Sequence, residues 1–303
     1  MTILVTGGAG FIGSNIVDEL LNNNHNVIVI DNLSTGKKEN INSKVEFFEL
    51  DIRSKKISKV FKSHDIDFVF HLAAQIDVNQ SIENPCFDAD NNINGSINIL
   101  KNCRANNIKK VIYSSSAAVY GIPNYLPIDE NHFVSPISPY GISKHTPEHY
   151  LMIYNKLYGL NYTILRYSNV YGPRQTTSGE GGVISIFIDR MLSNKNPVIF
   201  GDGEQTRDFI YVEDVVQANI SALNKGKNEI LNISNSTKTS VNEIVTIINN
   251  KLDRNIKPVY KDKRSGDILH SVLDNKKAKK KLAWSPNYNI NMGIEKALDY
   301  IKF

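Results

Sequence analysis

Cysteine and tryptophan are scarce in this chain, whose 303 residues include two cysteines and one tryptophan. Cys86 and Cys103 cannot form a disulfide framework, and they could pair only if the fold brought them together. A reduced, cytoplasmic state is therefore the default expectation. No apolar run approaches the ~20 residues that a membrane span needs, and no signal peptide is visible. We expect a cytoplasmic protein without a membrane partner.

The chain also lacks a strong charge of one sign, an internal repeat and a low-complexity linker. Its net charge is +4, and its contents of 41% hydrophobic and 22% charged residues are ordinary for a soluble enzyme. The lysine-rich stretch 276–281 is more typical of the solvated face of a helix than of a nucleic-acid patch. We therefore predict no nucleic-acid partner, and we assign no metal ligands. The length allows two domains or one large one.

A glycine-rich turn stands near the start of the chain. Residues 2–5 predict a buried strand, which leads into the GxxGxxG sequence of residues 7–13 and then into an apolar-periodic helix through Leu21. Glycines let the backbone approach a pyrophosphate, and the free N–H groups of the helix start favour an anion. A second strand, 27–30, ends at Asp31, where the dinucleotide fingerprint has an acid for the adenosine ribose. Because a carboxylate repels a 2′-phosphate, NAD is favoured over NADP.

Residues 114–144 carry the candidate catalytic groups. The apolar residues 111–113 end in three serines, as a buried strand does when it delivers hydroxyls to a cleft. Ser138 and Pro139 predict the start of a helix, which places Tyr140 and Lys144 on one face. An ammonium beside a phenol lowers the phenol pKa, so Tyr140 could act as a base near neutral pH. On most helices such a pair is only two amphipathic side chains, but the glycine turn strengthens the functional interpretation.

These motifs together resemble the extended short-chain dehydrogenase/reductases, and more narrowly the UDP-glucose/UDP-N-acetylglucosamine 4-epimerases. The resemblance covers almost the whole chain through the segments TGGAGFIGS, DNLSTG, HLAAQ, SSSAAVYG, SPYGISK, NVYGPRQ, GDGEQTRDFIYVEDV and RSGDILHSVLD. The alternation of strands and helices in the first half independently predicts an α/β fold with a doubly wound parallel sheet.

The resemblance implies a Rossmann-like NAD-binding domain and a smaller α/β domain for the nucleotide sugar. We assign residues 1–167 and about 208–233 to the first, and residues 168–207 and 234–303 to the second. The helices expected at 87–106 and 139–157 pair across the dimer in the family, so a homodimer is implied. The last helix is expected at 290–301, with Trp284 as its anchor.

The resemblance implies that NAD stays bound and is regenerated in each turnover. The implied cofactor-binding residues are Gly7, Gly10, Phe11, Ile12, Gly13, Asp31, Asn32, Ser34, Gly36, Asp51, Ile52, Leu72, Ala73, Ala74, Gln75, Asn91, Ser114, Tyr140, Lys144 and Tyr167. Some have simpler explanations. Asp51 could be an ordinary carboxylate at a strand end, the alanines could serve packing alone, and asparagine is common in turns for local reasons.

For the substrate, the resemblance implies contacts by Ser116, Tyr140, Asn169, Val183, Val198, Phe200, Arg207, Arg264, Asp267 and Ser271. Two of these, Arg207 and Arg264, match the arginines that bind the diphosphate, and a guanidinium suits phosphate because its donors form a planar fork. The catalytic residues would be Ser116, Tyr140 as the base, and Lys144. Many relatives carry Phe in place of Ser168, and His270 receives no role.

These residues imply 4-epimerisation of a UDP-hexose by transient oxidation at C4. Dehydratases of the family usually carry Asp-Glu after the catalytic serine or threonine, whereas Ser116 is followed by Ala117 and Ala118. Ser271 stands where a bulky Tyr would close the sugar pocket, so UDP-N-acetylglucosamine and UDP-N-acetylgalactosamine should be accepted with UDP-glucose and UDP-galactose. A UDP-glucuronate epimerase or decarboxylase, an NAD-sensing regulator and a dehydrogenase with net redox turnover remain alternatives.

Overall fold

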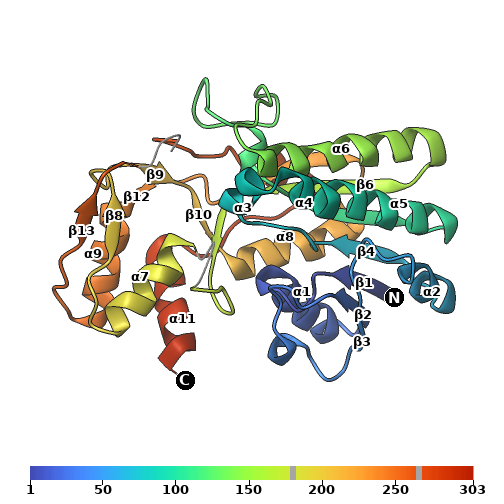
Figure 1. Ribbon diagram of the computed structural model, residues 1–303, viewed down its shortest axis with the longest axis horizontal. Helices are drawn as coiled ribbons and strands as arrows, with labels where there is room; N and C mark the ends of the chain where they lie inside the picture. The colour runs from blue at the N-terminus through green and yellow to red at the C-terminus, as the bar shows by residue number, and fades with distance from the viewer. Residues whose placement is uncertain (178–181, 264–267, 303) are drawn as a thin grey trace.

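A computed structural model describes residues 1–177, 182–263 and 268–302 of the chain. Its centre is a seven-stranded sheet in the order β11-β6-β5-β4-β1-β2-β3, in which every neighbouring pair is parallel (Figure 1). The strands are β1 (Thr2–Thr6), β2 (Asn26–Asp31), β3 (Glu46–Glu49), β4 (Phe68–His71), β5 (Lys110–Ser116), β6 (Asn161–Tyr167) and β11 (Glu229–Ile233). The predicted doubly wound parallel sheet is confirmed.

Helices cover both faces of this sheet. One face packs on α1 (Phe11–Asn22), α8 (Val212–Asn224) and α10 (Lys276–Leu282), and the other on α2 (Ile57–Ser63), α5 (Gly95–Ala105) and α6 (Pro139–Tyr158). Figure 1 shows α5 and α6 on one side of the strands and α1 and α8 on the opposite side. Successive side chains of a strand point to opposite faces, so Ile3 and Val5 enter one core cluster and Leu4 enters the other. Burial on both faces explains why the inner strands β1, β2 and β4 are almost continuously apolar, whereas the edge strand β3 has glutamates at both ends and no buried residue.

The helix expected at 87–106 is built from three parts. Residues Pro85–Ala89 form α4, Asp90–Asn94 form the π-helical turn η2, and α5 continues from Gly95. A short helix, α3 (Val78–Glu83), precedes them. Such a turn inserts extra backbone into a helix, often at functional sites. No residue in the stretch predicts this interruption.

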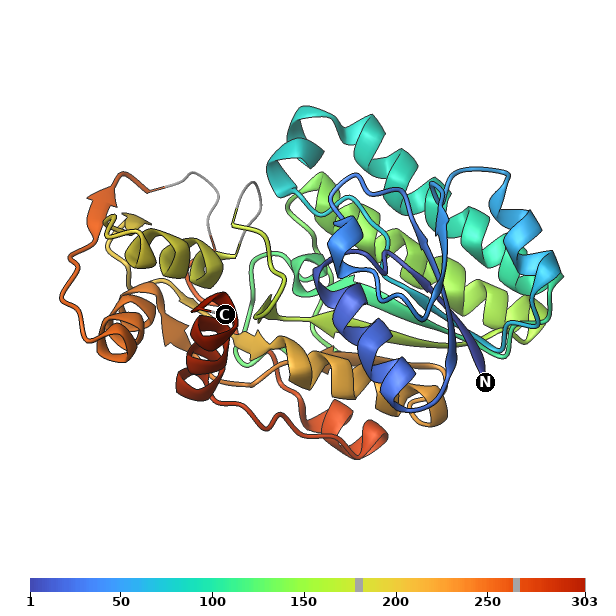
Figure 2. The ribbon, with the colours of Figure 1, turned by 90° about the horizontal axis from the view of Figure 1, so that it is seen from below.

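A second group of elements lies beside the sheet (Figure 2). Its helices α7 (Val183–Leu192), α9 (Val241–Leu252) and α11 (Ile290–Lys302) share one apolar cluster. Its short strands pair as β8 (Val198–Phe200) with β13 (Val259–Lys261), and β9 (Thr206–Arg207) with β12 (Thr239–Ser240). A further pair, β7 (Asn169–Tyr171) with β10 (Phe209–Tyr211), runs between this group and the large sheet. The domain boundaries stay a prediction.

The expectation that Trp284 anchors the last helix is wrong. Its indole Nε1 donates to the main-chain oxygen of Asp214 at 2.9 Å, and its ring packs in the cluster of α1, α8 and α10. The buried residues of α11 belong to a different cluster. Trp284 therefore fastens the segment before α11 to the helix layer of the large sheet.

Both cysteines are free, with Cys86 exposed and Cys103 buried, so the expected absence of a disulfide framework is confirmed. Within the described ranges, none of the helices combines the length and the apolar character needed to cross a membrane.

Candidate functional site

The glycine turn between β1 and α1 is packed backbone against backbone. Gly7 has φ +74°, and a Cβ there would lie 2.7 Å from the nitrogen of Ala73. A Cβ at Gly13 would lie 2.1 Å from the oxygen of Gly7. At the start of α1, Gly10 is the N-cap, and it provides no side chain to bond the first N–H groups of the helix. The turn therefore has the narrow backbone and the available donors that a pyrophosphate requires.

Asp31, at the end of β2, is held against this turn. Its carboxylate accepts hydrogen bonds from the nitrogens of Ala9 at 3.0 Å and Leu33 at 2.8 Å. Burial raises the pKa of Asp31, although both hydrogen bonds favour the ionised form. A carboxylate has about four lone-pair sites, so two remain for a ribose diol. Gly36 packs against Ala9 and Asp31 and keeps the following loop close.

Asp51 belongs to a charged cluster beyond Asp31. It accepts from Asn32 Nδ2 at 2.9 Å and pairs with Arg53 at 2.7 Å, and Arg53 also pairs with Asp90 at 2.9 Å. The hydrogen bond from Arg53 lowers the pKa of Asp51 to about 2. Asp51 is thus an ion-paired carboxylate with fixed partners rather than an isolated carboxylate at a strand end. Sequence reasoning missed Arg53, whose partners become neighbours only in the fold.

Ser116 and the start of α6 lie on neighbouring segments. Ser116 Oγ accepts from the nitrogen of Ala118 at 3.2 Å, where the 3₁₀ turn η3 (Ala117–Val119) begins. Ser138 Oγ accepts from the nitrogen of Gly141 at 3.1 Å, so the predicted N-cap is confirmed. The nitrogen of Tyr140 donates to Ser81 Oγ at 3.1 Å. These contacts fix the first turn of the helix that carries Tyr140.

Lys144 is almost completely buried, with 3% of its surface exposed. Its Nζ lies 4.9 Å from the centre of the Tyr113 ring, a cation–π contact. Burial lowers the pKa of Lys144 to about 8, while the carboxylates of Glu148 and Asp88 oppose that change. Lys144 therefore remains mostly protonated at neutral pH. It lies one helical turn after Tyr140 and can act as the cation beside a phenol.

The π-helical turn holds α6 through a buried amide network. Gln75 Nε2 donates to Asp88 Oδ1 at 2.9 Å, and the main-chain nitrogen of Gln75 donates to Asn92 Oδ1 at 2.7 Å. Asn92 Nδ2 in turn donates to Ser143 Oγ at 2.9 Å, next to Lys144. Asn91, the predicted nicotinamide-side residue, donates its Nδ2 to the main-chain oxygen of Phe87 one turn earlier, and its cofactor contact stays a prediction. Two consecutive asparagines gave no indication that Asn92 is the buried one.

A buried ion pair lies one turn beyond Lys144. Glu148 has no exposed side-chain surface; its Oε1 accepts from Ser115 Oγ at 2.6 Å and from Arg166 Nε at 2.9 Å. His145 Nδ1 lies 3.0 Å from the other carboxylate oxygen. Burial opposes ionisation, but the bonds to Arg166 and His145 prevail and lower the pKa of Glu148 to about 2. Sequence reasoning missed this network, which joins α6 to β5 and β6.

The remaining predicted cofactor residues lie at or near the carboxyl ends of parallel strands, where open α/β sheets bind ligands. The nitrogen of Leu72 donates to the main-chain oxygen of Thr6 at 3.1 Å, and the nitrogen of Ala73 donates to Thr6 Oγ1 at 3.3 Å. The Tyr167 hydroxyl lies 3.0 Å from Asn219 Oδ1, and burial raises the pKa of Tyr167. Phe11, Ile12 and Gly13 form the start of α1, Ser34 lies two residues after Asn32, Ala74 follows Ala73, and Ser114 lies on β5. Ile52, which is buried, packs against Gly95.

Three predicted substrate residues meet around β9. Arg207 lies on this strand, and its Nη1 donates to the main-chain oxygen of Thr206 at 3.0 Å. The same oxygen accepts from the nitrogen of Ser271 at 3.1 Å. The nitrogen of Asn169 bonds to the main-chain oxygen of Asp208 at 2.9 Å. The fold thus brings Arg207, Ser271 and Asn169 onto adjoining segments.

The other predicted substrate residues are more widely spread. Val183 begins α7, and Val198 and Phe200 lie on β8. Arg264 and Asp267 lie outside the described residues. His270 Nδ1 is 3.0 Å from Thr206 Oγ1, next to Arg207. Ser168, where many relatives carry Phe, is buried.

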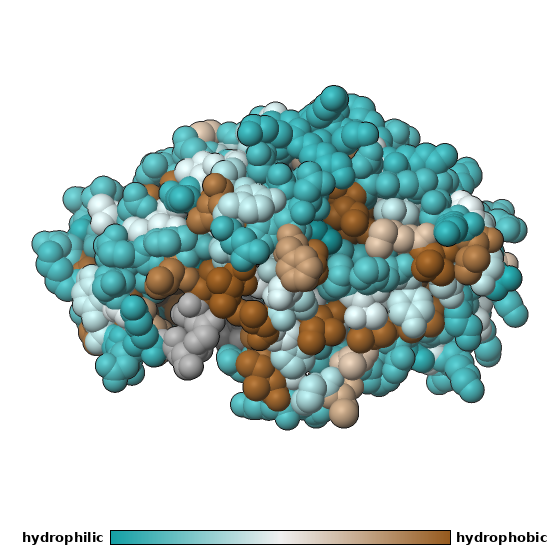
Figure 3. All heavy atoms as spheres, turned by 90° about the horizontal axis from the view of Figure 1, so that it is seen from above, coloured by the Kyte–Doolittle hydropathy of each residue, from teal (hydrophilic) through white to brown (hydrophobic). Residues whose placement is uncertain are grey.

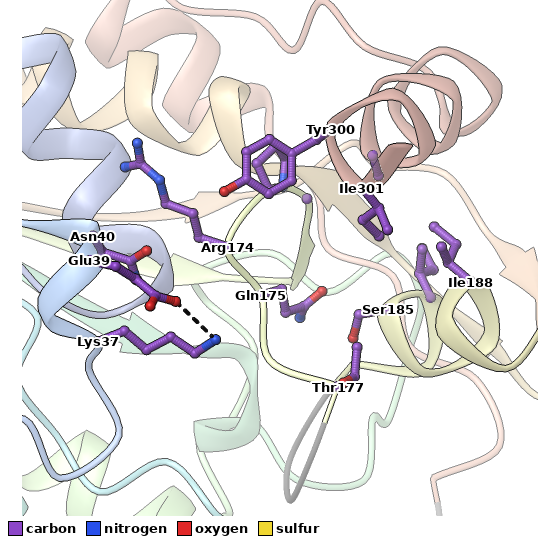
Figure 4. Close-up of a pocket in the computed structure, with 14 residues that line it drawn as sticks. Lys37, Glu39, Asn40, Arg174, Gln175, Thr177, Ser185, Ile188, Tyr300 and Ile301 are labelled. Atoms are coloured by element: carbon purple, nitrogen blue, oxygen red, sulfur yellow. Dashed lines mark ion pairs between the residues drawn. The ribbon is translucent and has the colours of Figure 1, made fainter. Parts of the chain in front are cut away.

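A separate cavity of about 170 Å³ lies between the loop after β2, the segment after β7, and helices α7 and α11 (Figure 4). Among the residues that the structure describes, none of the predicted site residues lines it. Its charged groups have partners: Lys37 pairs with Glu39 at 3.4 Å, and Arg174 turns toward Asp18 of α1 at 2.6 Å. We therefore place the candidate site at the sheet edge described above.

Comparison with known proteins shows the family to which the chain belongs. The model of the NAD dependent epimerase/dehydratase family matches residues 3–234, most of the chain. The chain belongs to the NAD-dependent epimerase/dehydratase family. Its cofactor is NAD, as predicted, and the glycine turn and Asp31 fit that cofactor.

The relatives include several 4-epimerases. A putative UDP-glucose 4-epimerase of Methanocaldococcus jannaschii is 53% identical over 99% of this chain and 98% of its own. The structure of UDP-glucose 4-epimerase from Thermotoga maritima with UDP-glucose is 46% identical, has a TM-score of 0.98, and is matched over 100% of this chain and 99% of its own. The UDP-N-acetylglucosamine 4-epimerase of Methanobrevibacter ruminantium, in complex with UDP-N-acetylmuramic acid, is 39% identical with a TM-score of 0.95, over 99% and 98% of the two chains. The resemblance stated from the sequence is confirmed.

Proposed function

We propose that this chain is a UDP-hexose 4-epimerase that accepts UDP-glucose and UDP-galactose and also their N-acetylated counterparts. The observation that carries the proposal is that Lys144 is buried one helical turn after Tyr140. Ser116, at the end of β5, and the glycine turn lie at the same edge of the sheet. UDP-glucose in the Thermotoga maritima structure supports a UDP-sugar as substrate.

The proposed chemistry divides between the cofactor and the chain. Bound NAD would supply the hydride acceptor and donor for sugar C4 and would be regenerated in each turnover. Tyr140, as phenolate, takes the proton from the 4-hydroxyl and later returns it. Lys144 provides the positive charge that stabilises the phenolate, and Ser116 hydrogen-bonds the same sugar oxygen.

On the substrate side, Arg207 holds the diphosphate while the sugar turns over. A guanidinium can keep two phosphate oxygens through paired hydrogen bonds. Arg264, which we expect to share this role, and Asp267, which we expect at the uridine ribose, complete the proposal. Asn169, Val183, Val198 and Phe200 would line the path of the nucleotide.

The side chain at position 271 bears on the choice of sugar. Serine is small, and its main-chain nitrogen is fixed to Thr206 beside Arg207. A small group there leaves room for a 2-acetamido substituent. The UDP-N-acetylglucosamine 4-epimerase among the relatives supports acceptance of N-acetylated sugars.

The test is a turnover assay of the purified protein without added cofactor. UDP-galactose and UDP-N-acetylgalactosamine are offered separately, and the 4-epimers are resolved by chromatography. Conversion of both is expected. Conversion of UDP-galactose alone would contradict the argument from Ser271. If neither is converted while NAD remains bound, the proposal is wrong, and UDP-glucuronate is the next substrate to offer. Stoichiometric NADH formation would indicate a dehydrogenase instead.

We also propose that two copies of the chain associate through α6. Ile142, Tyr150, Ile153 and Leu157 are between 37% and 62% exposed and lie on this one helix. Their spacing places them along one side, and apolar patches are visible on the face that α6 crosses (Figure 3). Light scattering of the native protein should give the mass of a dimer, and Leu157→Glu should weaken the association of the two copies. A native protein that stays monomeric at micromolar concentration would contradict this proposal.

A further inference from the structure

Four chain segments meet at Asp208, directly before β10. Only 1% of its surface is exposed. Its carboxylate accepts three main-chain hydrogen bonds, from Asn235 at 2.9 Å, Ser236 at 3.1 Å and Leu273 at 3.1 Å. Its own main-chain oxygen accepts from the nitrogen of Asn169 at 2.9 Å. Asp208 therefore joins the chain near residues 169, 208, 235 and 273, which are far apart in the sequence.

Three of the four joined segments lead to a residue of the proposed sugar-nucleotide site. Arg207 precedes Asp208 directly, Asn169 bonds to its oxygen, and Ser271 lies two residues before Leu273. The hydroxyl of Ser236 donates to the main-chain oxygen of Leu273 at 2.9 Å, which strengthens the same junction. The carboxylate itself is too buried to contact a substrate. Any effect of Asp208 on the substrate must act through its neighbours.

We propose that Asp208 is a positioning residue whose carboxylate fixes Arg207 and Ser271 relative to one another and thereby sets the affinity for the nucleotide diphosphate. This inference rests on the proposed function. A carboxylate suits the position because its two oxygens accept all three N–H groups. An amide of the same size offers one oxygen and an NH₂ group, which would face N–H donors and leave at least one unpaired.

Asp214 provides a matched control. It is also fully buried, and its carboxylate accepts main-chain hydrogen bonds from Asn287 at 2.7 Å and Tyr288 at 3.1 Å. These bonds hold the segment before α11, and neither partner belongs to the proposed sugar-nucleotide site. Asp214→Asn therefore makes the same chemical change in the same kind of contact. A purely structural role for Asp208 predicts that the two variants behave alike.

The experiment measures UDP binding by titration calorimetry for the native protein, Asp208→Asn and Asp214→Asn, together with bound NAD and melting temperature. Burial raises the pKa of Asp208 to about 7, so the titration is run at about pH 8.5, where this carboxylate is ionised. We expect Asp208→Asn to weaken UDP binding by about tenfold or more and to leave bound NAD unchanged. Asp214→Asn should lower the melting temperature and change UDP affinity less than about twofold.

Equal UDP affinity in Asp208→Asn and the native protein would overturn the inference, and so would an equal loss in both variants. A native protein that does not bind UDP would overturn the proposed function, and this inference with it. If Asp208→Asn does not fold, Ser236→Ala decides. It removes the hydrogen bond that the Ser236 hydroxyl donates to the main-chain oxygen of Leu273, which keeps its bond from Ser234 Oγ at 3.2 Å, and it leaves the Asp208 carboxylate in place. We expect it to weaken UDP binding about threefold with NAD retained, and unchanged affinity would refute the positioning role.

Discussion

Replacing Glu148 by Gln should destabilise the protein strongly, because the change leaves the Arg166 guanidinium buried without its counter-charge. The side chain of Arg166 is 3% exposed and that of Glu148 is not exposed at all. The substituted glutamine would keep an oxygen for the Ser115 hydroxyl, so that contact can survive. The loss is therefore mainly electrostatic and concerns one residue on α6 and one on β6.

Two arguments give its magnitude. Removing one partner of a buried ion pair typically costs about 3–5 kcal/mol of unfolding free energy. Independently, the pKa of Glu148 is lowered from 4.5 to about 2, which corresponds to about 3 kcal/mol of linkage at neutral pH. This stabilisation is present above about pH 4.5 and is lost as the pH falls toward about 2, because the folded state then has to take up a proton that it binds weakly.

Urea unfolding at one protein concentration measures this effect. Glu148→Gln should lose about 3–5 kcal/mol at pH 7, and its stability should change less with pH between about 4.5 and 2 than that of the native protein. The double variant E148Q/R166M should recover most of the loss, since no charge is left unpaired. The control is Glu295→Gln, which removes an exposed pair with Lys251 and should cost less than about 1 kcal/mol. A loss below about 1 kcal/mol in Glu148→Gln, or no recovery in the double variant, would refute this reasoning.

Three further predictions concern the proposed active site. Tyr140→Phe should lower kcat by about 10²–10⁴-fold, as measured with UDP-galactose, and leave bound NAD unchanged; retained turnover would exclude Tyr140 as the base. Because burial lowers the pKa of Lys144 to about 8, kcat should fall as the pH rises through about 8 and Lys144 loses its proton. Lys144→Arg stays charged well above that pH, so its residual activity should not show this fall in a pH–rate profile; an identical alkaline decline would assign it to another group. Ser271→Tyr should raise KM for UDP-N-acetylgalactosamine by about tenfold or more and change KM for UDP-galactose less than about threefold, and equal changes for both would refute the role of position 271.

The features that the sequence predicted correctly depend on residues close together in the chain. Ser138 caps α6 because its hydroxyl reaches a nitrogen three residues on, and Gly7 is required because of its positive φ. The inner strands β1, β2 and β4 are recognisable because both their faces are buried and apolar. In each case a short window of sequence contains the whole physical cause.

What the sequence did not predict depends on contacts between distant segments. Arg166 and Glu148 are 18 residues apart, and Asp208 and Leu273 are 65 apart. The burial of Asn92 in the π-helical turn was not predicted either, while the cofactor contact assigned to Asn91 stays a prediction. Trp284 was expected to anchor the last helix but packs in the cluster of α1, α8 and α10, since a large apolar side chain does not indicate which of two cores it enters.

The buried carboxylates explain how irregular segments hold a site in place. Asp31, Asp208 and Asp214 each accept hydrogen bonds from main-chain nitrogens of loops or turns, where no sheet ladder can satisfy those donors. Substitutions of the sheet core should therefore affect stability throughout the protein, whereas a change at one of these carboxylates should affect the group that its own loop carries. The comparison of Asp208→Asn with Asp214→Asn tests this distinction directly, because the two carboxylates make the same kind of bond and only one of them lies behind the proposed sugar-nucleotide site.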